Sequence, residues 1–88
     1  MQVVTTPSFN KDISKIKDRT LARRIEKVIE MMLSAPNITS VTGVKKLEGS
    51  TNAYRIRIAD YRLGFLLEGK TIRLAVFAHR KDIYRHFP

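Results

Sequence analysis

The spacing of apolar residues changes once along this chain, near Val44, and the change separates a helical part from a sheet part. Before Val44, apolar side chains recur every three or four residues, which is the period of an α-helix. After Val44 they recur every second residue, which is the period of a β-strand. Helical segments that precede a run of strands, without alternating with them, predict the α+β class.

The first part predicts a strand and two helices. Gln2–Thr6 is β-prone and stops at Pro7, and Ser8 then stands where a helix N-cap belongs. Asp18 is expected to cap a second, longer helix, which ends near Ser34 because a proline follows two residues later. The apolar stripes of the two helices, which we expect to form a hairpin, are Phe9, Ile13 and Ile16, and Leu21, Ile25, Val28, Ile29, Met32 and Leu33.

The second part predicts an antiparallel meander. Three alternating runs are joined by connections short enough for hairpin turns, namely Tyr54–Ile58, Tyr61–Leu67 and Ile72–Val76. Val44–Leu47 is a weaker fourth run, and alternation places Ile72, Leu74 and Val76 on one face. The expected architecture is a single α+β domain over 1–88, with an N-terminal strand and a two-helix hairpin packed on one face of a small antiparallel β-sheet.

Charge and composition narrow the classes of function. The chain carries 17 Lys and Arg against 8 Asp and Glu, a net charge of +9, and this balance favours a phosphate backbone or an acidic protein as partner. The absence of cysteine excludes a disulfide scaffold, a thiolate zinc site and a cysteine nucleophile. No apolar run approaches the roughly 20 residues that span a bilayer, and no export signal is recognisable, so we expect a cytoplasmic protein without membrane contact.

Strong catalytic motifs are absent from the sequence. There is no glycine-rich phosphate loop, no His-Glu-x-x-His zinc motif and no nucleophile elbow. His79 and His86 lie near the end of the chain with no carboxylate cluster beside them, so we expect neither a metal nor a cofactor. Asp60 and Asp82 are most simply turn residues.

A set of cations with one phenol stands out instead. Alternation sends Arg55 and Arg57 to the exposed face of their strand, and a tight turn brings Arg57 within side-chain reach of Arg62. Taken singly, each arginine can also be explained as a solvated surface residue. Tyr84 can also be explained as a residue that covers the edge of the sheet. Four more members of the set lie in what we expect to be a closing turn or one-turn helix: Arg80, Lys81, Tyr84 and Arg85.

Taken together, these groups suit phosphodiester cleavage. The reaction needs positive charge where the pentavalent phosphorane develops, a group that takes the proton of the 2′-hydroxyl, and a group that protonates the leaving oxygen. An arginine meets the first need through its bidentate fork. Tyr84 and His79 are the candidates for the other two roles, and a phenol becomes a useful base only where neighbouring cations lower its pKa.

Four segments resemble the RelE/ParE superfamily of bacterial and archaeal toxins from toxin–antitoxin pairs. They are Val-Lys-Lys-Leu-Glu-Gly (44–49), Tyr-Arg-Ile-Arg-Ile (54–58), Asp-Tyr-Arg-Leu (60–63) and Ala-His-Arg-Lys-Asp-Ile-Tyr-Arg (78–85). The length of the chain and the expected order of elements match as well, so the resemblance covers essentially the whole chain. It implies either of two activities, because RelE-like members cut mRNA in the ribosomal A site whereas ParE-like members poison DNA gyrase without RNase activity.

The basic residues and the tyrosine favour the RelE-like branch, in which the 2′-hydroxyl attacks the adjacent phosphate without a metal. In this branch Arg62 is implied to stabilise the transition-state phosphate, Arg80 to act on the leaving group or phosphate, and Tyr84 to orient or deprotonate the nucleophile. His79 is an alternative general acid, because other branches use histidine. The residues expected to bind RNA phosphates are Arg55, Arg57, Lys45, Lys46, Lys81 and Arg85.

The resemblance also implies partners. A cognate antitoxin is expected to cover the basic surface with a partly disordered acidic or amphipathic segment, and mRNA in the ribosomal A site is the expected substrate.

Arginine rarely gives up its proton, so Arg55 and Arg57 are expected to bind phosphate and not to act as bases.

Overall fold

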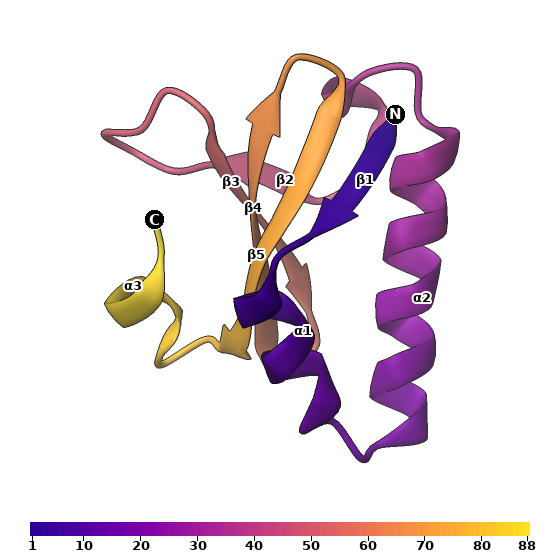
Figure 1. The fold of residues 1–88 in the computed structure, drawn as a ribbon, viewed down its shortest axis with the longest axis vertical. Helices are drawn as coiled ribbons and strands as arrows, with labels where there is room; N and C mark the ends of the chain where they lie inside the picture. The colour runs from indigo at the N-terminus through magenta and orange to yellow at the C-terminus, as the bar shows by residue number, and fades with distance from the viewer.

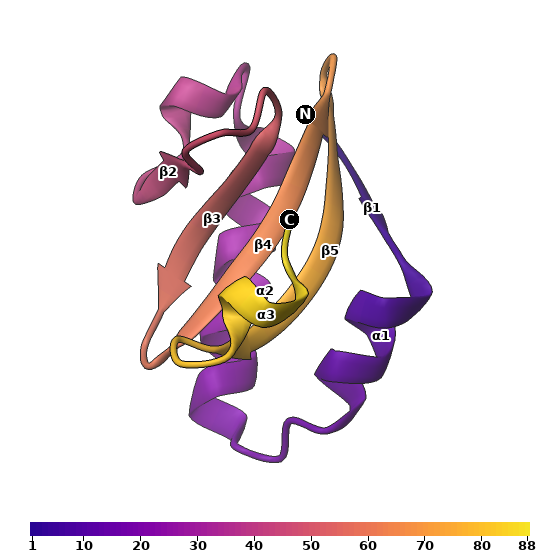
Figure 2. The same cartoon turned by 90° about the vertical axis from the view of Figure 1, so that its left-hand side faces the viewer.

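The computed structural model describes residues 1–88 and confirms the α+β class. Figure 1 and Figure 2 show three layers, with α1 and α2 on one face of a sheet and α3 on the other. None of these helices combines the length and the apolar composition of a membrane span. The elements in chain order are β1 (Gln2–Thr5), α1 (Pro7–Ser14), α2 (Arg19–Ser34), the 3₁₀ turn η1 (Ile38–Ser40), β2 (Val44–Lys46), β3 (Ala53–Ile58), β4 (Tyr61–Glu68), β5 (Thr71–His79) and α3 (Ile83–His86).

The sheet is mixed, whereas the sequence led us to expect a purely antiparallel one. Its strand order is β1-β5-β4-β3-β2, and the last four strands form the predicted antiparallel meander. β1 joins the far edge parallel to β5, with Gln2 opposite Thr71 and Thr5 opposite Leu74. A parallel neighbour needs a long crossover connection, which the two helices and the meander provide.

The caps of the two long helices are partly as expected. Asp18 caps α2, since its Oδ1 accepts hydrogen bonds from the amides of Thr20 and Leu21 at 2.8 and 3.1 Å. The N-cap of α1 is Thr6 and not Ser8, because the Thr6 hydroxyl accepts a 3.2 Å hydrogen bond from the next turn of the helix. Pro7 therefore occupies the first helical position, where a missing N–H costs nothing.

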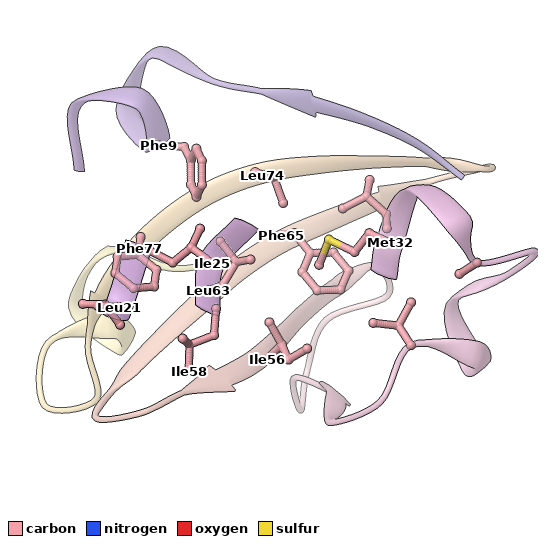
Figure 3. Packing of buried hydrophobic residues seen from close by; sticks show 13 residues of the cluster. Phe9, Leu21, Ile25, Met32, Ile56, Ile58, Leu63, Phe65, Leu74 and Phe77 are labelled. Carbon is pink, nitrogen blue, oxygen red and sulfur yellow. The ribbon is translucent and has the colours of Figure 1, made fainter. Parts of the chain in front are cut away.

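The main core lies between the sheet and the helices α1 and α2 (Figure 3). Its members come from both parts of the chain, so the helical stripes and the alternating strands pack together as their periods predict. Leu33 is the exception, because this predicted member of the second helical stripe is 54% exposed. The cluster consists of Phe9, Leu21, Ile25, Met32, Ala35, Val41, Ile56, Ile58, Leu63, Phe65, Ile72, Leu74 and Phe77.

A bulge between β4 and β5 changes which side chains face this core. Gly64 pairs with Val76 while Phe65 pairs with Leu74, so Ala75 is one extra residue on β5. Beyond the bulge the alternation is reversed, and Phe77 lies in the main core. The prediction that Val76 shares a face with Leu74 is therefore wrong.

Val76 belongs instead to a second, smaller core on the opposite face, which anchors α3. This cluster contains Ala53, Val76, Ile83 and Phe87. The ring of Phe87 approaches the sheet so closely that a Cβ on Gly64 would lie 2.7 Å from its Cδ2 atom. The closing segment thus forms a turn and a one-turn helix, as predicted, and a glycine in β4 allows it to dock.

We expect Gly64→Ala to destabilise the protein by about 1–3 kcal/mol, because the new methyl group overlaps Phe87 and Val76. Urea unfolding measures this cost. In a Phe87→Ala background the same change should cost clearly less, since one of the two obstacles is gone. An equal cost in both backgrounds would show that Phe87 does not lie against Gly64.

Candidate phosphate-binding site

Three arginines share the face of the sheet that carries α3. Ala53 packs in the α3 cluster, and alternation along β3 puts Arg55 and Arg57 on the same side. Arg57 lies directly opposite Arg62 of β4. Because opposite residues of an antiparallel pair point to the same side, the prediction that these two side chains lie within reach of each other is confirmed.

Arg62 is the most constrained of these cations. Its Nη1 atom donates hydrogen bonds to the carbonyl oxygens of Tyr61 at 2.9 Å and Ala59 at 3.2 Å, and the side chain is half-buried. Burial lowers the pKa of Arg62, and the positive charges of Arg57, Arg55 and Arg80 lower the pKa further, while Tyr84 raises it. The guanidinium stays charged near neutral pH, so the cluster favours a bound anion.

Tyr84 reaches this face from α3. Its side chain is 62% exposed although its neighbour Ile83 is fully buried, so α3 is fixed by its apolar side and presents the phenol to solvent. Tyr84 and Arg55 border one hollow of about 300 Å³ between β2, β3 and α3. The full lining is Lys45, Lys46, Leu47, Glu48, Arg55, Tyr84 and Pro88.

Three further residues near the site were missed by the sequence analysis, namely Glu48, Arg24 and Lys27. Glu48 is the one acidic side chain among the residues that line the hollow, and a carboxylate can accept a proton. Its position inside the basic segment 44–49 was a signal that could have been used. Arg24 and Lys27 of α2 border a second hollow of about 210 Å³ together with Arg57. The basic surface therefore continues around the sheet edge onto α2.

The closing segment brings one more cation toward Arg62. The backbone N–H of Arg80 donates a 2.8 Å hydrogen bond to the carbonyl of Asp60 in the β3–β4 turn, and its charge is among those that lower the pKa of Arg62. Lys81 and Arg85 are exposed, and their side chains form no ion pair. No cluster of three or more His, Asp or Glu side chains is arranged to hold a metal ion.

His79 is not brought together with the arginines. It lies opposite Tyr61 on β4, and the Tyr61 ring stacks on Phe77 of the main core, so His79 lies on the face that carries α1 and α2. Its ring meets Tyr61 edge-on with centroids 5.6 Å apart, and its Nδ1 atom accepts a 3.2 Å hydrogen bond from the Lys81 amide.

The chain is similar to known proteins along nearly its whole length. Residues 3–84 match the family model described as the ParE toxin of the type II toxin–antitoxin system parDE. Toxin RelE3 of Methanocaldococcus jannaschii is 34% identical over 89 residues, with 100% of both chains covered. A chain of the RelB–RelE antitoxin–toxin complex from Methanococcus jannaschii shares 32% identity and a TM-score of 0.81, covering 97% of this chain and 99% of that one.

The archaeal RelE–RelB complex from Pyrococcus horikoshii OT3 has the same fold, with a TM-score of 0.72, 23% identity and coverage of 90% and 93%. These matches define the class of the protein as the toxin component of a type II toxin–antitoxin system. Within this class, the chain belongs to the RelE/ParE superfamily and is RelE-like.

We expect Arg57→Gln to stabilise the free protein by about 0.2–1 kcal/mol, because it removes a like charge directly opposite Arg62. Thermal melts at low and high salt measure the effect, and the gain should shrink as salt screens the pair. Arg73→Gln is the matched control, since Arg73 is also an exposed strand arginine but is paired with Glu68 at 2.8 Å. A loss of stability in Arg57→Gln at low salt would show that the two charges do not repel.

Proposed function

We propose that this toxin is a metal-independent endoribonuclease of the cytoplasm that cleaves mRNA in the ribosomal A site and so inhibits translation. The observation that supports this function most directly is the convergence of Arg57, Arg62 and Tyr84 on one face of the sheet. The full-length similarity to a RelE toxin favours the same activity.

The chemistry follows from the groups around the site. A scissile phosphate bound by Arg57 and Arg62 would have its developing negative charge stabilised, with Arg62 already oriented by two carbonyl oxygens. The 2′-oxygen then attacks phosphorus, the bond to the 5′-oxygen breaks, and the products are a 2′,3′-cyclic phosphate and a 5′-hydroxyl. Tyr84 and Glu48 are the groups beside the hollow that can exchange the two protons with RNA.

The open shape of the site suggests why a ribosome is needed. Tyr84 is largely exposed, and the hollow beside it has no lid, so nothing in this chain holds a flexible mRNA in an attack geometry. The A site would supply this positioning, which is worth several orders of magnitude in rate.

A second candidate function is the inhibition of DNA gyrase without RNA cleavage. This function is favoured by the family model that matches residues 3–84, because that model describes a ParE toxin. On this alternative the arginines form a binding surface and the phenol has no chemical role.

The test is primer extension on mRNA in programmed ribosomes, beside a ribosome-free control. We expect cleavage within the A-site codon only with ribosomes present. Arg62→Ala should lower the cleavage rate by about 10²–10³-fold and Tyr84→Phe by about 10²-fold or more, through loss of charge stabilisation and of a proton-transfer group.

Arg73→Ala is the control variant, because Arg73 is an exposed strand arginine whose partner is Glu68 and not the site. It should cleave like the unchanged protein. If the mRNA stays intact although the protein still stops cell growth, the result would favour inhibition of gyrase over RNA cleavage. If both site variants cleave mRNA at the full rate, the roles given to Arg62 and Tyr84 would be excluded.

A protein partner is the second part of the proposal. The similar archaeal toxins were solved in complex with RelB antitoxins, and this chain carries a charge of +9 with a single ion pair, Arg73 with Glu68. An acidic antitoxin segment that folds on this surface would relieve its self-repulsion.

We expect the melting temperature of the toxin to rise strongly on co-purification with its antitoxin, because a ligand that binds only the folded state stabilises it. Differential scanning calorimetry of the free toxin and of the complex measures the shift. The rise should be smaller at high salt. An unchanged melting temperature would exclude an antitoxin that wraps the toxin.

A further inference from the structure

His79 accepts two of the hydrogen bonds that hold the turn between β5 and α3, one through its backbone carbonyl and one through its ring. The carbonyl of His79 accepts a 2.8 Å hydrogen bond from the Asp82 amide, and its ring Nδ1 accepts a 3.2 Å bond from the Lys81 amide. The Arg80 amide in between donates to Asp60 of the β3–β4 turn at 2.8 Å. Three successive amides of this turn are thus bonded, two of them to His79.

The ring that accepts the Lys81 amide is itself fixed by the main core. It meets Tyr61 edge-on, and Tyr61 stacks on Phe77 with ring centroids 5.0 Å apart and planes 3° apart. The amide of Phe77 in turn donates a 3.0 Å hydrogen bond to Oδ2 of Asp12 in α1. His79 is therefore linked to β4 by its contact with Tyr61 and, through Phe77 and Asp12, to α1.

The helix that follows, α3, is too short to fix its own orientation. α3 is one turn long, and helices this short are unstable by themselves. Asp82 occupies its N-cap position but makes no side-chain cap hydrogen bond. The place of Tyr84 is therefore set by two things, the burial of Ile83 and Phe87 against the sheet and the turn that His79 organises.

We propose that His79 is a positioning residue for Tyr84 and not the general acid of the reaction. The inference rests on the proposed ribonuclease function for its catalytic readout. The ring lies on the opposite face of the sheet from Arg57 and Arg62, and its Nδ1 is occupied by the Lys81 amide. A ring nitrogen that accepts a hydrogen bond carries no proton, so the geometry assigns the ring proton to Nε2.

Asparagine distinguishes positioning from acid catalysis at this site. A bond from the amide two residues ahead is the pattern of an Asx turn, which an Asn side chain forms readily but an Ala side chain cannot. We expect His79→Asn to cleave mRNA on ribosomes within about threefold of the unchanged protein. His79→Ala should be about tenfold slower, as expected for the loss of one local hydrogen bond.

An equal loss of about 10²-fold or more in both variants would overturn the proposal, because it is the result expected for a general acid. His86→Ala is the matched control, since His86 borders the same hollow as His79 but its ring makes no hydrogen bond. It should cleave at the unchanged rate.

Nuclear magnetic resonance tests the turn without any cleavage assay. We expect the His79 proton on Nε2 at neutral pH, and slow exchange of the Lys81 amide in the unchanged protein and in His79→Asn but not in His79→Ala. A proton on Nδ1, or equal exchange in all three proteins, would overturn the positioning role. If the unchanged protein cleaves no mRNA, the proposed function fails while these spectra still decide how the turn is held.

Discussion

The β-bulge at Ala75 reverses the alternation of side chains along β5, and both apolar cores of the protein depend on this reversal. Before the bulge Leu74 faces the long helices, and after it Phe77 does. Val76 is thereby turned to the other side, where it meets Ile83 and Phe87. Without that apolar patch α3 would have no surface on which to dock, and Tyr84 would not lie beside the arginine strands.

On the same face of the sheet, repulsion among the arginine side chains destabilises the free protein. Burial and neighbouring cations both lower the pKa of Arg62, yet its orientation is fixed by the carbonyl oxygens of Tyr61 and Ala59. The Arg62 guanidinium is thus held among other positive charges, where a bound anion would stabilise it. Arg73 and Glu68, the one ion pair, lie near the β4–β5 turn, so no carboxylate of the chain forms an ion pair with the cluster.

Sequence periodicity predicted the elements that depend on local patterns. The two helices, the Asp18 cap, the meander and the Arg57–Arg62 pair follow from apolar spacing and short turns. What it missed depends on contacts between distant segments: the parallel β1, and the bulge that moved Val76 to the other face. At the site, alternation brought the arginines together, but it could not show that His79 points away from them or that Glu48 borders the hollow with Tyr84.

The pairing of β1 with β5 also decides when the protein can finish folding during its own synthesis. Thr6 donates its hydroxyl hydrogen to the carbonyl of Leu74, a bond that spans 68 positions of sequence. Ribosomes make the N-terminal strand first and release it into a space where its partner does not yet exist. The sheet is therefore completed only after β5 has left the exit tunnel, although the strand at its edge is the first to be made.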